Sequence, residues 1–161
     1  MELLGVRLEL PANAPVVLLR EQVGEQRVLP IYIGPEEAKA IALALEGVVP
    51  PRPLTHDLLR DVLGALDVAV VRVSVTALED RTFFAELELR VDGRTVRVSA
   101  RPSDAIALAV RVDCPIYAAE AVLDEAAAPP EDEEGDGQEQ EEIVEEFREF
   151  IDQVNPEDFA S

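Results

Sequence analysis

The sequence predicts a single α+β domain, with a mixed or antiparallel β-sheet of about six or seven strands packed with three to four helices. Three observations predict this class. Stretches of alternating apolar and polar residues, typical of half-buried strands, recur along residues 1–128. Apolar residues at helical spacing lie between them. After residue 128 the composition changes to an acidic extension with few apolar residues.

The strands follow from alternation and from turn residues. Val6, Leu8 and Leu10 alternate with charged residues, which indicates one buried face. Asp92-Gly93 lies between two alternating stretches and predicts a tight hairpin turn. The expected strands are residues 3–10, 16–20, 27–33, 68–76, 82–91, 94–100 and 115–118.

The helices follow from start signals and apolar faces. Pro35, followed by Glu36 and Glu37, is typical of a first helical turn, where acids complement the helix dipole. The expected helices are residues 36–46, 56–66, 103–111 and 120–127. In the second helix the apolar residues are expected to face inward; they are Leu58, Leu59, Val62 and Leu63.

The stretch 38–45 leaves little polar surface on its helix. Such a helix is buried on most sides or covered by another subunit. From this stretch we predict a homo-oligomer.

The acidic extension divides into three parts. Residues 129–141 are rich in Asp, Glu, Gly and Pro, which predicts a disordered linker after the domain of residues 1–128. Residues 142–155 have apolar residues at helical spacing and predict an amphipathic helix, with Phe147, Phe150 and Ile151 as its anchors; residues 156–161 form a tail. This helix either packs on its own domain or a sister subunit, or binds a protein partner.

The net charge of −20 is unevenly distributed, with −7 in residues 1–128 and −13 in residues 129–161. Nucleic-acid-binding proteins usually present a basic patch, which this sequence lacks. The start of the sequence does not resemble a signal peptide, and no segment approaches the roughly 18 apolar residues of a membrane span. Cys114 is the only cysteine, so we expect a cytoplasmic protein without disulfides or membrane association.

Three motifs occur in order along the domain. Residues 29–38 read Leu-Pro-Ile-Tyr-Ile-Gly-Pro-Glu-Glu-Ala, residues 52–57 read Arg-Pro-Leu-Thr-His-Asp, and residues 101–107 read Arg-Pro-Ser-Asp-Ala-Ile-Ala. With these motifs the chain resembles the bifunctional nuclease domain family over residues 3–128, and its acidic extension resembles that of actinobacterial members. The resemblance implies phosphodiester hydrolysis with DNA or RNA as substrate.

The motifs contain the candidate catalytic residues. His56 is the only histidine, so one chain cannot supply a two-histidine acid–base pair. We expect His56, Asp57 and Asp104 to be catalytic, and Arg52 and Arg101 to bind phosphate. The structural alternative is that His56 and Asp57 stabilise a helix start and that the arginines form internal salt bridges.

The acids of the first helical turns could also bind a metal ion. Glu37, Asp57 and Asp104 offer the oxygen ligands that Mg²⁺ or Mn²⁺ would need if these turns converge. The alternative is that each acid stabilises its helix dipole, which is worth about 0.3–1 kcal/mol. No other cofactor motif is present in the sequence.

Two functions therefore remain open from the sequence. The first is a nuclease assisted by a divalent metal ion. The second is a non-enzymatic oligomeric module that presents its C-terminal helix to a protein partner, which the acidic charge favours.

Overall fold

The structure, a computed structural model, describes residues 1–130 and confirms the α+β class. Within these residues seven strands and four helices follow one another along the chain. The elements are β1 (Glu2–Glu9), β2 (Ala14–Arg20), β3 (Val28–Tyr32), α1 (Pro35–Leu45), α2 (Thr55–Ala65), β4 (Ala69–Glu79), β5 (Thr82–Val91), β6 (Arg94–Ala100), α3 (Pro102–Val112), β7 (Ile116–Ala118) and α4 (Glu120–Ala126).

The seven strands are divided between two sheets. β1, β2 and β3 form an antiparallel sheet in that order, and the second sheet has the order β6-β5-β4-β7. In the second sheet only β7 is parallel to its neighbour, β4. The hairpin between β5 and β6 turns at Asp92 and Gly93, which both have positive φ, as the sequence predicts for this dipeptide.

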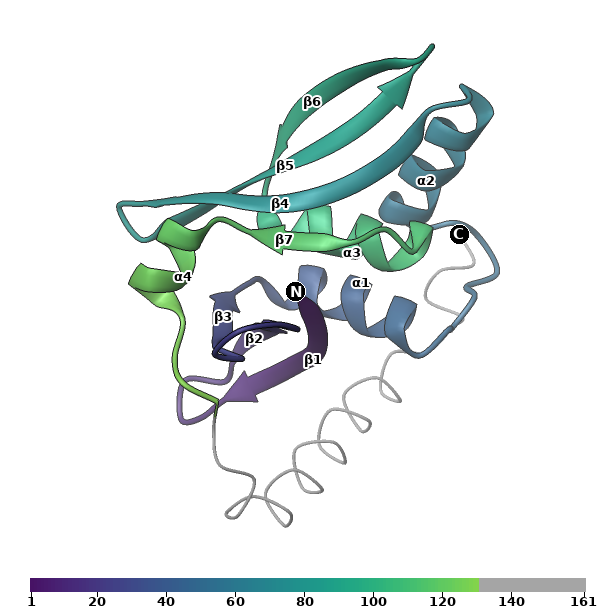
Figure 1. The fold of residues 1–161 in the computed structure, drawn as a ribbon. Coiled ribbons are helices and arrows are strands. Elements are labelled where there is room, and N and C mark those ends of the chain that lie inside the picture. Colours follow the sequence, from purple (N-terminus) through teal and green to yellow (C-terminus); the bar gives the residue numbers. More distant parts are fainter. Residues whose placement is uncertain (131–161) are drawn as a thin grey trace.

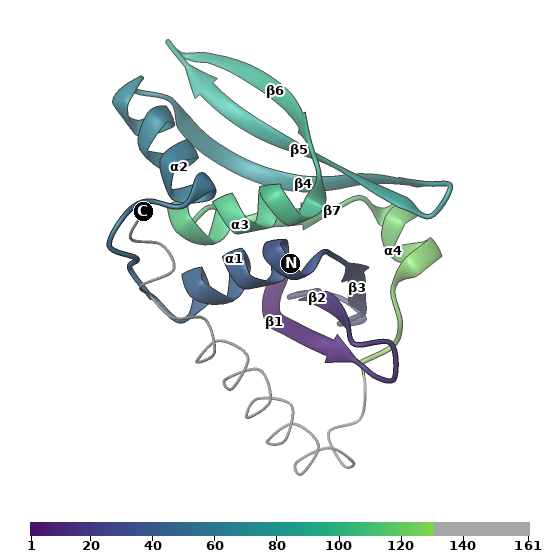
Figure 2. The same cartoon turned by 180° about the vertical axis from the view of Figure 1, so that it is seen from behind.

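Helix α3 is the centre of the domain. It contacts α1 and α2 as well as β4 and β5. Both views show α3 running beneath the four-stranded sheet with α1 on its other side (Figures 1 and 2). Seven of the eleven residues of α3 are buried, including every residue of the segment Ala105–Ala109.

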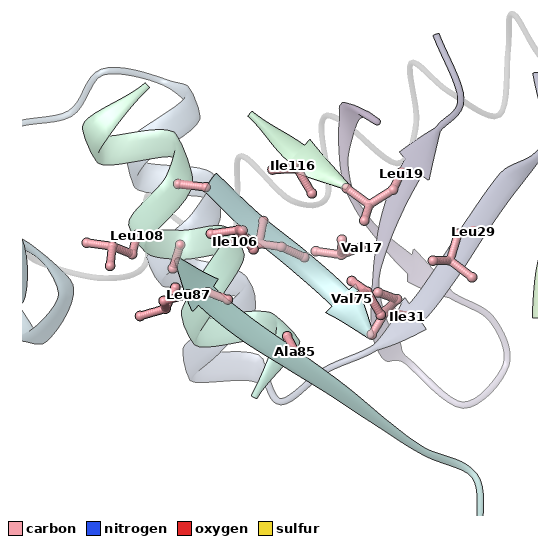
Figure 3. Packing of buried hydrophobic residues seen from close by; sticks show 14 of the residues in the cluster. Val17, Leu19, Leu29, Ile31, Val75, Ala85, Leu87, Ile106, Leu108 and Ile116 are labelled. Carbon is pink, nitrogen blue, oxygen red and sulfur yellow. The ribbon is translucent and has the colours of Figure 1, made fainter. Parts of the chain in front are cut away.

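The core is built from aliphatic side chains of both sheets and α3. Val17 and Ile31 from the three-stranded sheet point toward Val75 and Ile106, and all four are buried (Figure 3). Because the core joins both sheets, the start of α3 is held at a fixed position between them.

Helix α2 packs against the core with only one of the four apolar residues that the sequence predicts to face inward. Leu63 packs against the core, whereas Leu58, Leu59 and Val62 are exposed, so the prediction that these three face inward is wrong. The physical reason is that α2 turns Asp57 toward α3, where a buried ion pair holds it.

In α1, by contrast, Ala38, Ile41 and Ala42 are buried within one chain. The chain's own core therefore explains these three residues, whereas Leu45 is 45% exposed, and the homo-oligomer stays a prediction.

None of the helices in residues 1–130 combines the length and apolar character required to cross a bilayer. Residues 131–141 of the expected linker, the expected C-terminal helix and its anchors Phe147, Phe150 and Ile151 lie outside the described residues.

Candidate active site

Three helices each carry an acid as their third residue. These acids are Glu37 in α1, Asp57 in α2 and Asp104 in α3. The first turn of a helix has free N–H groups and the positive end of the dipole, which favour a carboxylate at this position. The three acids have different partners, and the partners decide what each acid can do.

Arg101, the residue directly before α3, links two of these helix starts. Its Nε and Nη2 donate to the two oxygens of Asp104, at 2.7 and 3.1 Å. Its Nη1 donates to Glu37 Oε1 at 2.9 Å, across 64 residues of sequence. The guanidinium therefore joins the start of α1 to the start of α3.

His56, the second residue of α2, joins the third helix start to the other two. Its Nε2 lies 3.0 Å from Asp104 Oδ1, and its side chain is 13% exposed. We call Glu37, His56, Arg101 and Asp104 the helix-start cluster.

The protonation of Asp104 fixes the role of each imidazole nitrogen. Burial raises the pKa of Asp104, but the hydrogen bonds from Arg101 and His56 outweigh it and lower that pKa below its usual value. Because an ionised carboxylate only accepts hydrogen bonds, His56 must donate Nε2–H to it. In neutral His56, Nδ1 is then the nitrogen that can accept a proton.

Gly34 makes room for Glu37. A Cβ atom added to Gly34 would lie 2.2 Å from Glu37 Oε2. The backbone φ of Gly34 is −77°, which other residues adopt readily, so a side chain here is disfavoured by the close approach alone. The absence of a side chain at position 34 thus allows Glu37 to fold back while it holds Arg101.

The cluster keeps free donors toward solvent. A guanidinium has five N–H donors, and the contacts with Asp104 and Glu37 use three of them. Both carboxylates raise the pKa of Arg101, so it stays charged, and its side chain is 65% exposed. With neutral His56 the formal charge of the cluster is −1, and with protonated His56 it is zero.

Asp57 lies apart from this contact chain. Its Oδ1 accepts from Arg111 Nε at 2.6 Å, and its Oδ2 accepts from the backbone N–H of Leu54 at 2.9 Å. Arg111 also donates to the carbonyl of Ala107 at 2.8 Å. These contacts support the structural reading of Asp57 as a helix-start residue, here combined with a buried ion pair.

Sequence reasoning did not identify Arg111. Its only sequence signal is a basic residue in the last turn of an otherwise apolar helix, and such a residue usually complements the dipole.

Arg52 lies in the loop before α2 and is exposed. It forms no ion pair or hydrogen bond with another residue of the described part of the chain. The structure thus places Arg52 two residues before the N-cap of α2, Leu54, without fixing its guanidinium.

The acids of the helix starts do not form a metal site within residues 1–130. Among residues 1–130, no group of three or more His, Cys, Asp or Glu side chains is arranged to hold a metal ion. Glu37 and Asp104 instead hold the guanidinium of Arg101 between them. In this arrangement they do not fit Mg²⁺ or Mn²⁺.

Comparison with known proteins gives the following matches. A family model described as the bifunctional nuclease domain matches residues 17–131. Uncharacterized proteins from two strains of Mycobacterium tuberculosis are 50% identical over 164 residues, which cover 100% of this chain and 98% of theirs. Bifunctional nuclease 2 of Arabidopsis thaliana is 32% identical over 112 residues, 66% of this chain and 34% of its own length.

A rice protein, bifunctional nuclease 1 of Oryza sativa subsp. japonica, is 27% identical over 114 residues, 68% of this chain and 34% of its own length. The chain thus matches about a third of each of these plant proteins. The span of the family model, residues 17–131, includes all four residues of the helix-start cluster.

Proposed function

Because the chain belongs to the bifunctional nuclease domain family, we propose that it hydrolyses phosphodiester bonds of nucleic acids at the helix-start cluster. The observation that carries this proposal is the contact chain from Arg101 through Asp104 to His56. The Arg101 guanidinium and the His56 imidazole both contact the Asp104 carboxylate. Phosphodiester hydrolysis needs both groups, the first to stabilise charge and the second to move a proton.

Substrate binding is assigned to the two arginines. Arg101 offers its two remaining N–H donors to a phosphate oxygen, and Arg52 adds an exposed cation before α2. Arg52 is needed because the cluster alone is not cationic, and a phosphodiester carries one negative charge. Loss of either arginine should therefore weaken substrate binding.

Proton transfer is assigned to His56. Nδ1 of His56 takes a proton from the attacking water while the water oxygen forms a bond to phosphorus and the phosphorus–oxygen bond of the leaving group breaks. The leaving oxygen takes its proton from solvent, because the chain has no second histidine. Asp104 keeps the imidazole in the required tautomer, as a positioning residue.

A nuclease assay on the full chain tests this proposal. The protein is purified in denaturant and refolded, which removes contaminating nucleases, and is incubated with labelled single-stranded and duplex DNA and RNA. We expect cleavage that persists in EDTA, because Arg101 occupies the position between the carboxylates. Cleavage that requires Mg²⁺ or Mn²⁺ would instead favour a metal route through Glu37, Asp104 and Asp57.

A folded chain that cleaves none of these substrates would contradict the proposal. It would favour the second candidate, a non-enzymatic module that presents residues 142–155 to a protein partner. The charge of −13 in residues 129–161 is the observation that favours this candidate. The cytoplasmic location stays a prediction under either function.

Glu37 competes with phosphate for Arg101, which gives a further prediction. Replacing Glu37 with glutamine should tighten oligonucleotide binding roughly threefold, because a negative charge that shares Arg101 with the bound phosphate is removed. Gly34→Ala should act in the same direction by displacing the Glu37 carboxylate, with little loss of stability because a flexible side chain gives way.

Fluorescence anisotropy with a labelled oligonucleotide measures both effects. Glu36→Gln is the matched control, since Glu36 lies beside Glu37 in the first turn of α1 and carries the same charge. Equal effects of Glu36→Gln and Glu37→Gln would contradict a specific contact with Arg101.

A further inference from the structure

Helix α2 presents an apolar face to solvent. Leu58, Val62 and Leu66 follow one another at intervals of four residues, and they are 54, 44 and 67% exposed. Leu59 lies beside them and is also exposed. We call these four residues the α2 face. Single exposed apolar residues are normal, but four on one side of a helix indicate a surface that something covers.

The polar residues of α2 account for this orientation. Asp57 and His56 point inward, because their partners Arg111 and Asp104 both belong to α3. The helix therefore cannot turn the α2 face toward the core without breaking both contacts. The apolar side stays outward within the described residues.

Strand β6 extends the exposed apolar surface. Val96 and Val98 pair with Leu89 and Leu87 of β5, which are buried against α3. Cross-strand partners share one face of a sheet, so both valines lie on the side of the sheet that α3 covers. Both are 42% exposed.

A cation lies toward each end of the α2 face. Arg52 precedes the first turn of α2. Arg94 lies beside the turn between β5 and β6. This turn is near the end of α2, because Ala69, three residues after Leu66, pairs with Arg90. Neither arginine forms an ion pair or hydrogen bond with another described residue. At the second end, exposed Asp67 follows Leu66 directly, so a matching ligand would be apolar along its centre and acidic near Arg52.

We propose that residues 142–155 of the same chain dock as a helix on the α2 face. This segment has apolar residues at helical spacing with acids between them. Fourteen residues make a helix of about 21 Å, and the eleven residues of α2 span about 16 Å. The apolar stripes of the two helices are therefore of similar length, and the acids of the segment supply partners for Arg52. The apolar residues are Ile143, Val144, Phe147, Phe150, Ile151 and Val154.

The linker is long enough for this contact. The described chain ends at Pro130, just after Ala128, which is bridged to Val28. Residues 131–142 span at most about 40 Å, and a domain of this size is about 36 Å across.

Dilution distinguishes this occupant from a second copy of the chain, because a contact within one chain does not depend on the protein concentration.

A single tryptophan reports on the contact. The chain has no tryptophan, so Phe150→Trp introduces one fluorophore into the full chain. We expect blue-shifted emission that is shielded from a soluble quencher. Leu58→Gln with Val62→Gln should shift the emission to that of exposed tryptophan, whereas Val49→Gln should not, since Val49 is exposed in the loop before α2.

Three results would overturn the proposal. The first is solvent-exposed emission before any change in α2. The second is shielding that the α2 variants leave intact. The third is shielding that disappears on dilution, which would indicate a second copy. Circular dichroism verifies folding, and Leu66→Gln provides a second variant if the double variant does not fold.

Discussion

Replacing His56 with glutamine is expected to lower kcat by about 10²–10⁴-fold, the usual contribution of a general acid–base group. Glutamine can still donate a hydrogen bond to Asp104 but cannot take a proton from water. KM should change little, because phosphate binding is assigned to Arg52 and Arg101. Steady-state kinetics on a labelled oligonucleotide separates the two parameters.

A double variant shows whether Asp104 acts through His56. If it does, adding Asp104→Asn to His56→Gln should lower kcat much less than Asp104→Asn lowers it in the wild type. Asp61→Asn is the matched control, because Asp61 is an exposed acid of α2 that pairs only with neighbouring Arg60 among the described residues. Independent, multiplicative losses would contradict the positioning role of Asp104.

The second large effect concerns stability. Replacing Arg111 with methionine is expected to destabilise the fold by about 3–5 kcal/mol, the usual result of removing one partner of a buried ion pair. Arg111 is 5% exposed and Asp57 is 12% exposed, with 2.6 Å between Nε and Oδ1. Without Arg111 the Asp57 carboxylate keeps only the Leu54 N–H, so it is buried with an uncompensated charge.

Unfolding in urea at several pH values measures this effect. Burial raises the pKa of Asp57, but the hydrogen bonds from Arg111 and Leu54 outweigh it and lower that pKa. The ion pair therefore stabilises the fold above the unfolded pKa of aspartate, about 3.9, and this stabilisation is lost as pH falls from there through the lower folded pKa. In the Arg111→Met variant the free energy of unfolding should therefore lack most of this decrease at acidic pH.

A variant without either charge is the control. Asp57→Leu combined with Arg111→Met should recover much of the stability, because no buried charge is left without a partner. A single Arg111→Met variant as stable as the wild type would contradict the assigned ion pair.

The order of elements could be predicted from the sequence because each signal is local. Alternation identifies β5 and β6, Asp92-Gly93 identifies their turn, and Pro35 identifies the start of α1. The division into two sheets could not be predicted, since no local pattern shows which strands pair across the helices α1 and α2. The orientation of α2 was missed because an apolar stripe shows that a face exists but not what covers it.

The site could be predicted in part for a similar reason. Arg101, Asp104 and His56 are identified by their motifs, and the structure brings them into contact. The separation of Asp57 from them depends on Arg111, which is 54 residues away and has no motif of its own. The contact of Glu37 with Arg101 uses the space at Gly34, and the sequence alone does not show that the Glu37 carboxylate folds back onto this glycine.

The most direct test of the central claim compares wild type and His56→Gln side by side. Both proteins are refolded from denaturant and incubated in EDTA with a labelled single-stranded oligonucleotide under single-turnover conditions. A contaminating nuclease would cleave equally in both samples. We predict cleavage by the wild type and a rate at least about 100-fold lower for His56→Gln. Equal rates in the two samples, or no cleavage by the folded wild type, would contradict the proposal that the helix-start cluster is a nuclease site.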